Sequence, residues 1–133
     1  MKKKILIISS NYYKKISANL EKGAVNTLNE FNYRYEIIKA PGSFEIPYLI
    51  KKNINKYSGF IALGCVVKGK TYHFELICNE ITRKIIDISI KFDVPIGFGV
   101  LTCYNMKQAI ERSNNNKKNK GREAALACVA LLK

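Results

Sequence analysis

The side chains best suited to chemistry gather in one short segment, GCVVKGKTYHFE at residues 64–75. His73 is the only histidine in the chain, and a histidine ordinarily titrates near neutral pH, which suits proton transfer. Gly69, Lys70 and Thr71 stand just before a predicted helix, where backbone amides and the helix dipole can bind a phosphate. The segment therefore predicts a phosphate site beside a proton-transfer group. A capping histidine and a plain tight turn are the structural alternatives.

Candidate binding side chains also occur in other predicted loops. Tyr12 and Phe44 could stack on a planar ring, although core packing is the commoner use of an aromatic residue. Glu45 could accept hydrogen bonds from hydroxyl groups, or could simply complement the dipole of a helix start. Arg112 could hold a phosphate through two parallel hydrogen bonds.

Cys65 stands close enough to His73 in sequence to suggest a thiol nucleophile, but no third group that would orient such a pair is evident. A buried cysteine at the end of a strand is the usual case. The chain has four cysteines and no CxxC pair, which argues against a zinc site and a disulfide scaffold. We therefore expect reduced thiols in a cytoplasmic protein.

The elements that position these residues follow from hydrophobic periodicity. Helical stripes, one of which runs from Ile16 to Phe31 with Gly23 inside it, separate four apolar runs that predict strands. We expect close packing at Gly23, because an interior glycine costs about 1 kcal/mol relative to alanine. The predicted strands are Lys4–Ser9, Tyr33–Lys39, Gly59–Cys65 and Ile96–Thr102.

Several helix starts carry recognisable signals. Ser43 is predicted to cap a helix whose first turn contains Pro47. A second stripe runs from Phe74 to Ile88, and Asn105 with Gln108 resembles a capping box that opens a helix to about residue 112. Residues 122–132 form the last predicted helix.

Alternation of strands and helices predicts an α/β fold with a parallel sheet and helices on both faces. All strand-to-helix loops then meet at the carboxyl edge, where open α/β sheets bind ligands. A helix of about eight residues carries Arg112 roughly 12 Å away from that edge. If Arg112 and His73 serve one site, the site is therefore predicted to be shared between subunits. The strand-to-helix loops predicted to meet at the carboxyl edge are residues 9–13, 40–45, 64–73 and 102–105.

Composition predicts one domain spanning 1–133 with a single core, since the chain has 133 residues and is 47% hydrophobic. No apolar run approaches the roughly 20 residues needed to cross a membrane. The formal net charge of +13 leaves three interpretations open: a solvated basic surface, an anionic substrate, or nucleic acid. The scattered lysines favour the first, so we expect no nucleic-acid or membrane partner.

Five spaced motifs give the chain a resemblance to the 6,7-dimethyl-8-ribityllumazine synthase family: PGSFEIP at 41–47, GKTYHFE at 69–75, PIGFGVLT at 95–102, QAIER at 108–112 and NKGREAA at 119–125. The resemblance implies a flavodoxin-like three-layer sandwich, with a four-stranded parallel sheet, that assembles into pentamers or into capsids of twelve pentamers. It implies condensation of 5-amino-6-(D-ribitylamino)uracil with 3,4-dihydroxy-2-butanone 4-phosphate in riboflavin biosynthesis, without a cofactor or metal.

The resemblance also implies roles for individual residues. Tyr12 would stack on the pyrimidine, the segment Ser43, Phe44 and Glu45 would hold the ring and ribityl chain, and His73 would transfer protons. Further substrate contacts would come from the backbone of Cys65, Val66 and Val67, and from Gly69, Lys70 and Thr71 on the phosphate side. The adjacent subunit would contribute Phe98, Arg112 and Lys120.

Three departures from the family pattern stand out. Tyr13 replaces an asparagine that contacts the ribityl chain, and Lys68 replaces an arginine, which keeps the charge but loses the planar fork. The connector carries Ser113-Asn114 and Lys117-Lys118 where the family has small residues.

Three other functions remain open at this point: an archaeal-type riboflavin synthase, a non-catalytic shell protein and a nucleic-acid-binding module.

Overall fold

The sheet is wholly parallel, as the alternation of elements predicts. The computed structural model describes residues 4–116 and 118–133, so Lys117 and the first three residues of the predicted domain lie outside the described residues. The strand order is β2-β1-β3-β4, and all three pairings are parallel. All four predicted strands are confirmed, and each ends one or two residues later than expected. They are β1 (Lys4–Ser10), β2 (Arg34–Ala40), β3 (Gly59–Val67) and β4 (Ile96–Cys103).

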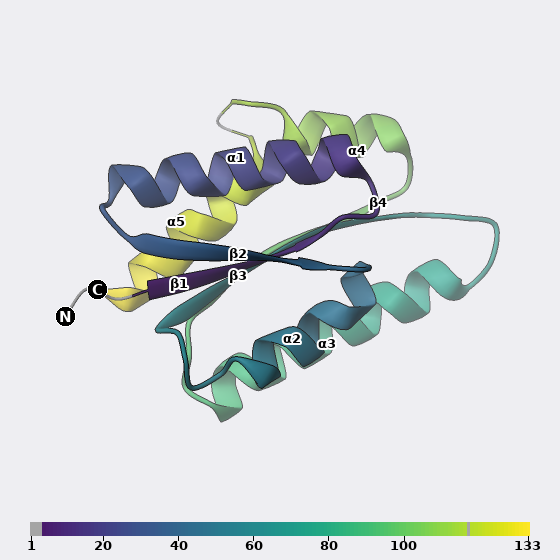
Figure 1. Cartoon of the computed structure of the whole chain (residues 1–133). Coiled ribbons are helices and arrows are strands. Elements are labelled where there is room, and N and C mark those ends of the chain that lie inside the picture. Colours follow the sequence, from purple (N-terminus) through teal and green to yellow (C-terminus); the bar gives the residue numbers. More distant parts are fainter. Residues whose placement is uncertain (1–3, 117) are drawn as a thin grey trace.

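Helices cover both faces of this sheet. Figure 1 shows α1, α4 and α5 on one face and α2 and α3 on the other. The strand order and the three layers are those of a flavodoxin-like fold, which confirms the expected fold class. The helices are α1 (Lys14–Glu30), α2 (Ile46–Lys52), α3 (His73–Lys91), α4 (Met106–Ser113) and α5 (Lys120–Leu132), and a 3-10 turn, η1 (Ser43–Glu45), precedes α2.

The central strand β1 divides its side chains between two apolar clusters. Ile5 and Ile7 pack with residues of α1 and α5, while Leu6 and Ile8 pack with residues of α2 and α3. Successive strand residues point to opposite faces, so a strand covered on both faces must be apolar at every position. This requirement explains the uninterrupted apolar run in the sequence.

Two glycines allow α1 and α5 to approach closely. A Cβ on Gly121 would lie 2.0 Å from the carbonyl oxygen of Leu20, and a Cβ on Gly23 would lie 2.1 Å from Oδ1 of Asn119. The expected close packing at Gly23 is therefore confirmed. Asn119 is only 1% exposed; its amide donates to the carbonyl oxygens of Asn19 and Ser113, at 3.0 Å each. Asn119 thus joins the ends of α4 and α5 to α1.

One predicted helix cap is confirmed and another is wrong. Oδ1 of Asn105 accepts from the amide of Gln108 at 2.9 Å. Ser43, by contrast, caps no helix, because it opens η1 and α2 begins only at Ile46. The hydroxyl of Ser43 faces β3, where a Cβ on Gly64 would lie 2.5 Å from it. The hydroxyl therefore points away from the amides of α2, whose N-cap residue is Glu45.

The long helices α1 and α3 end in the same type of turn. Asn32 and Asp93 adopt left-handed φ values of 61° and 52°. The following amide of Tyr33 donates to the carbonyl of Leu28 at 3.0 Å, closing the chain back onto the helix. Phe31, which the periodicity predicts to be helical, lies just after the end of α1 and is exposed. Both turns lie at the amino edge of the sheet.

Candidate active site

Several of the predicted site residues meet at the switch point of the sheet, where the connections from two neighbouring strands leave in opposite directions. From β1 the chain passes to β2 on one side, and from β3 it passes to β4 on the other. Ligands of open α/β sheets bind in the crevice outside such a switch point. A hollow of about 280 Å³, here called the carboxyl-edge hollow, lies there. It is lined by Tyr12, Tyr13, Gly42, Ser43, Phe44, Cys65, Val66, Val67, His73 and Ile77.

Two exposed aromatic rings flank this hollow. Tyr12 is 72% exposed and Phe44 is 57% exposed, although large apolar side chains normally gain free energy by burial. The ring of Tyr12 lies 4.9 Å from that of Tyr13 in an edge-on contact. Burial raises the pKa of Tyr13, and the nearby Cys65 and Tyr12 raise it further. The exposed rings therefore offer apolar surface to a planar ligand.

Ser43 supplies a hydroxyl to the same hollow. Its side chain is buried, and Oγ has no hydrogen-bond partner within the described part of the chain. A buried hydroxyl without a partner costs free energy, so it is available to bond to a ligand. Glu45 follows in η1 and does not line the hollow; its amide donates to the carbonyl of Gly42 at 3.3 Å.

The loop before α3 is exposed and lies beside the hollow rather than in its lining. Thr71 Oγ1 accepts from the amide of His73 at 3.4 Å, and Lys70 is exposed. A Cβ on Gly69 would meet no atom within 4 Å, and no glycine in the described ranges has a positive φ. The fold does not itself require glycine at position 69, so the backbone there is open to a ligand.

Lys68 is held on the β4 side of this loop. Its amide donates to the carbonyl of Cys103 at 2.8 Å. Its ammonium lies 5.4 Å from the centre of the Tyr104 ring and 3.9 Å from Glu75. These contacts orient the Lys68 ammonium, although the side chain stays exposed.

Cys65 does not have the properties of a nucleophile. Its side chain is buried, and burial raises the pKa of the thiol to about 12, with a further contribution from Cys103. The thiolate is the reactive form of cysteine. Cys65 is therefore neutral at physiological pH, which argues against the thiol-nucleophile alternative.

A second hollow, of about 500 Å³, runs along the free edge of β4 and is here called the β4-edge hollow. It gathers the predicted residues Phe98, Arg112 and Lys120, and among the described residues none lines both hollows. The positive charge of the nearby Arg112 guanidinium partly offsets the burial that raises the pKa of the Cys103 thiol. The remaining lining residues are Val100, Leu101, Thr102, Lys118 and Glu123.

Several lining residues were not predicted as site residues. Tyr13 and Lys118 were recognised only as departures from the family pattern. The sequence signal for a site role was their neighbourhood: Tyr13 follows the predicted site residue Tyr12, and Lys118 stands two residues before the predicted site residue Lys120. Ile77 belongs to the predicted helical stripe from Phe74 to Ile88, but such a stripe indicates core packing and gives no signal for a site residue.

The described residues contain neither a membrane-spanning helix nor a cluster of metal-binding side chains. No helix in residues 4–116 or 118–133 is long and apolar enough to cross a membrane. Among the same residues, no group of three or more His, Cys, Asp or Glu side chains could hold a metal ion.

An open parallel sheet with an aromatic-flanked, partly polar hollow at its switch point defines an α/β enzyme that acts on a small molecule. A sequence model of 6,7-dimethyl-8-ribityllumazine synthase matches residues 2–133. The chain belongs to this family. Synthases of this name from Bartonella tribocorum, Bartonella henselae and Vesicomyosocius okutanii are 43%, 42% and 40% identical. The matches cover 100%, 97% and 98% of this chain and 93%, 88% and 84% of those relatives.

Proposed function

We propose that the protein condenses 5-amino-6-(D-ribitylamino)uracil with 3,4-dihydroxy-2-butanone 4-phosphate. The products are 6,7-dimethyl-8-ribityllumazine, phosphate and water, in the penultimate step of riboflavin biosynthesis. The observation that carries the proposal is that Tyr12, Ser43, Phe44 and His73 surround one hollow at the switch point of the sheet. The match of the family over residues 2–133 identifies which small molecules such a hollow should take.

The ribitylaminouracil fits the carboxyl-edge hollow by its chemistry. Its planar ring can lie against Tyr12 and Phe44, and strand-end backbone at residues 65–67 offers hydrogen-bonding groups. The ribityl chain carries several hydroxyls, for which Ser43 and Glu45 supply a hydroxyl and a carboxylate. Holding both substrates in one cleft removes much of the entropic barrier to their reaction.

His73 acts as the proton-transfer group in this proposal. Imine formation, phosphate elimination and ring closure each move protons between nitrogen, oxygen and carbon. The His73 imidazole is exposed at the first turn of α3 and lines the hollow, and histidine is the side chain that most often serves as a general acid or base.

The phosphate of the second substrate binds between two copies of the chain. One copy supplies the open backbone at Gly69 with Lys70 and Thr71, and its neighbour supplies Arg112 and Lys120, with Phe98 beside them. The assignment of the two residues to different hollows supports this arrangement, because His73 lines the carboxyl-edge hollow and Arg112 lines the β4-edge hollow. The departing phosphate is then stabilised by fixed cations.

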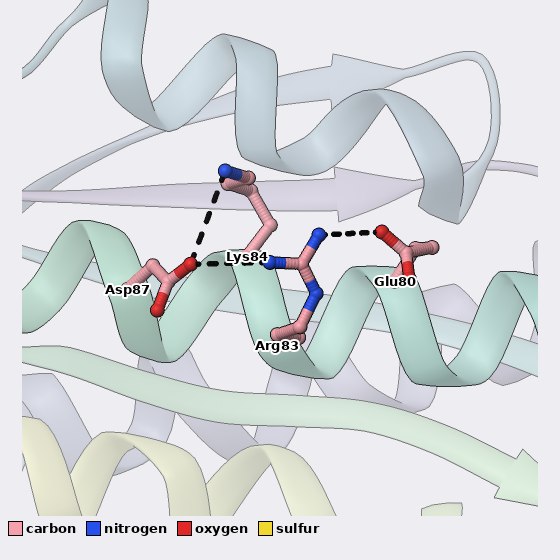
Figure 2. Close-up of polar contacts among 4 residues, drawn as sticks. All are labelled: Glu80, Arg83, Lys84 and Asp87. Carbon is pink, nitrogen blue, oxygen red and sulfur yellow. Dashed lines mark hydrogen bonds and ion pairs between the residues drawn. The ribbon is translucent and has the colours of Figure 1, made fainter.

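Exposed apolar side chains support a homo-oligomer. Leu76, Ile86 and Ile90 on α3 and Tyr48 on α2 are all exposed, and a hollow of about 620 Å³ lies between these helices. Figure 2 shows the flanking charges on α3, where Arg83 bonds to Glu80 at 2.7 Å and lies 3.5 Å from Asp87. Exposed large apolar side chains flanked by charges are typical of a protein interface.

The unpaired cysteines support a cytoplasmic location. Cys65, Cys78, Cys103 and Cys128 are all free. Free buried thiols are the rule in reducing compartments.

The test is to mix the protein with both substrates and follow lumazine absorbance against a protein-free mixture. We expect product only when both substrates are present. Failure to form lumazine under conditions where an authentic synthase works would overturn the proposal. Two further arms test the rivals: riboflavin formed from lumazine alone would indicate a riboflavin synthase, and strongly salt-dependent duplex binding would indicate a nucleic-acid-binding module.

A further inference from the structure

We propose that Lys118 is a third phosphate-binding cation of this chain, acting in the β4-edge hollow beside Arg112 and Lys120. The inference rests on the proposed function, since the anion it would bind is the phosphate of the four-carbon substrate or the inorganic phosphate released. Lys118 stands where the family pattern has a small residue, so it adds to the site a charge that the family motif does not contain.

The location of Lys118 is the first support. It lines the same hollow as Arg112 and Lys120, on the side formed by the connector between α4 and α5. Residues of β4 also line the hollow and shield part of its volume from water. Charges act more strongly in such a partly enclosed space than on a flat surface.

The second support is that the charge of Lys118 is not compensated by a carboxylate. The ammonium of Lys120 lies 3.6 Å from a carboxylate oxygen of Glu123. Lys118 forms no ion pair with any residue in the ranges 4–116 and 118–133. Its positive charge is therefore less compensated than that of Lys120, and its ammonium can pair with an incoming dianion.

The third support is that the backbone of Lys118 is anchored. Its amide donates to Oδ1 of Asn116 at 2.8 Å. The next residue, Asn119, is buried and hydrogen-bonded to α1 and to the end of α4. The ammonium therefore extends from a fixed point, which lowers the entropy lost when it binds an anion.

The experiment compares Lys118→Gln with Lys107→Gln in the assembled protein. Lys107 is exposed on α4 and does not line the hollow, so its variant removes the same charge elsewhere. Titration calorimetry with inorganic phosphate gives the Kd, and steady-state kinetics give KM for each substrate. For Lys118→Gln we expect Kd for phosphate and KM for the phosphorylated ketone to rise about two- to fivefold, the range for one exposed ion pair.

Three further results are expected. KM for the ribitylaminouracil should stay unchanged in Lys118→Gln, Lys118→Arg should retain phosphate affinity, and Lys107→Gln should match the unaltered protein. Equal phosphate affinity in Lys118→Gln and Lys107→Gln would overturn the inference. Loss of phosphate binding in Lys118→Gln, in a protein that forms no lumazine, would support the cation assignment while rejecting the proposed function.

Discussion

At the scale of single residues, His73 can be changed without disturbing the core. Its side chain is exposed at the first turn of α3, and only its backbone amide bonds to Thr71. The chemistry proposed for it should therefore be separable from folding.

We expect His73→Ala to lower kcat at least about tenfold, towards the hundredfold typical of losing a general acid or base. Thermal unfolding and sedimentation should match the unaltered protein. The measurement is steady-state kinetics with both substrates saturating. An unchanged kcat would remove His73 from the mechanism.

Cys128 makes the stability of the folded protein depend on pH in the alkaline range. It is fully buried on α5, and burial raises the pKa of its thiol from the ordinary 9.0 to about 12. Above about pH 9 the unfolded chain loses this proton while the folded chain keeps it, so folded stability falls as pH rises towards 12. One such thiol contributes a slope of up to about 1.4 kcal/mol per pH unit.

Cys128→Ala should therefore show a flatter decline in unfolding free energy between about pH 9 and pH 11. The variant will be less stable at neutral pH, because the alanine leaves a cavity. Denaturant titrations at several pH values measure the slope, which is independent of that constant loss. Parallel slopes in the two proteins would contradict the prediction.

At the scale of secondary-structure elements, the contact between α1 and α5 is the most tightly specified. We expect Gly121→Ala to destabilise the protein by about 2 kcal/mol or more, because its Cβ would meet the backbone of α1. Gly69→Ala is the matched control, since its Cβ would meet nothing. Thermal unfolding measures both variants, and equal midpoints would show that α5 can shift at little cost.

Periodicity predicted all four strands and the sheet direction because each apolar run is long and ends at polar residues. It placed Phe31 inside α1 because the stripe of apolar residues continues past the end of the helix. The sequence contains no glycine there, and the left-handed turn at Asn32 gives only a weak signal.

Local capping rules succeeded at Asn105 and failed at Ser43. The difference is tertiary: Asn105 is exposed and free to turn towards its own helix, whereas Ser43 is buried against Gly64. The site was predicted mainly by the topology, which brings the loops to one edge. The sequence could not show how the candidate residues are divided between the two hollows, because that division depends on side-chain positions. The reach of α4 predicts only that Arg112 lies away from the carboxyl edge.

At the scale of the whole molecule, the two hollows predict that activity depends on assembly. His73→Ala and Arg112→Ala each disable a different half of the proposed site. In a mixed ring, some interfaces will join an intact His73 from one copy to an intact Arg112 from the next.

Unfolding the two variants together and refolding them as a mixture should restore activity. Equal amounts should give about a quarter of the unaltered activity, because each half is drawn independently around a ring. The control is each variant refolded alone. A mixture no more active than its components, despite mixed oligomers in native mass spectrometry, would show that each copy holds a complete site.

The left-handed turns at Asn32 and Asp93 bear on how freely this chain can evolve. A non-glycine residue in that conformation carries a steric cost, which is smaller for asparagine and aspartate than for most residues. Both turns lie at the amino edge, at the opposite end of the strands from the carboxyl-edge hollow. Mutational drift at these two positions can therefore adjust heat tolerance while selection on catalysis acts on a different set of residues.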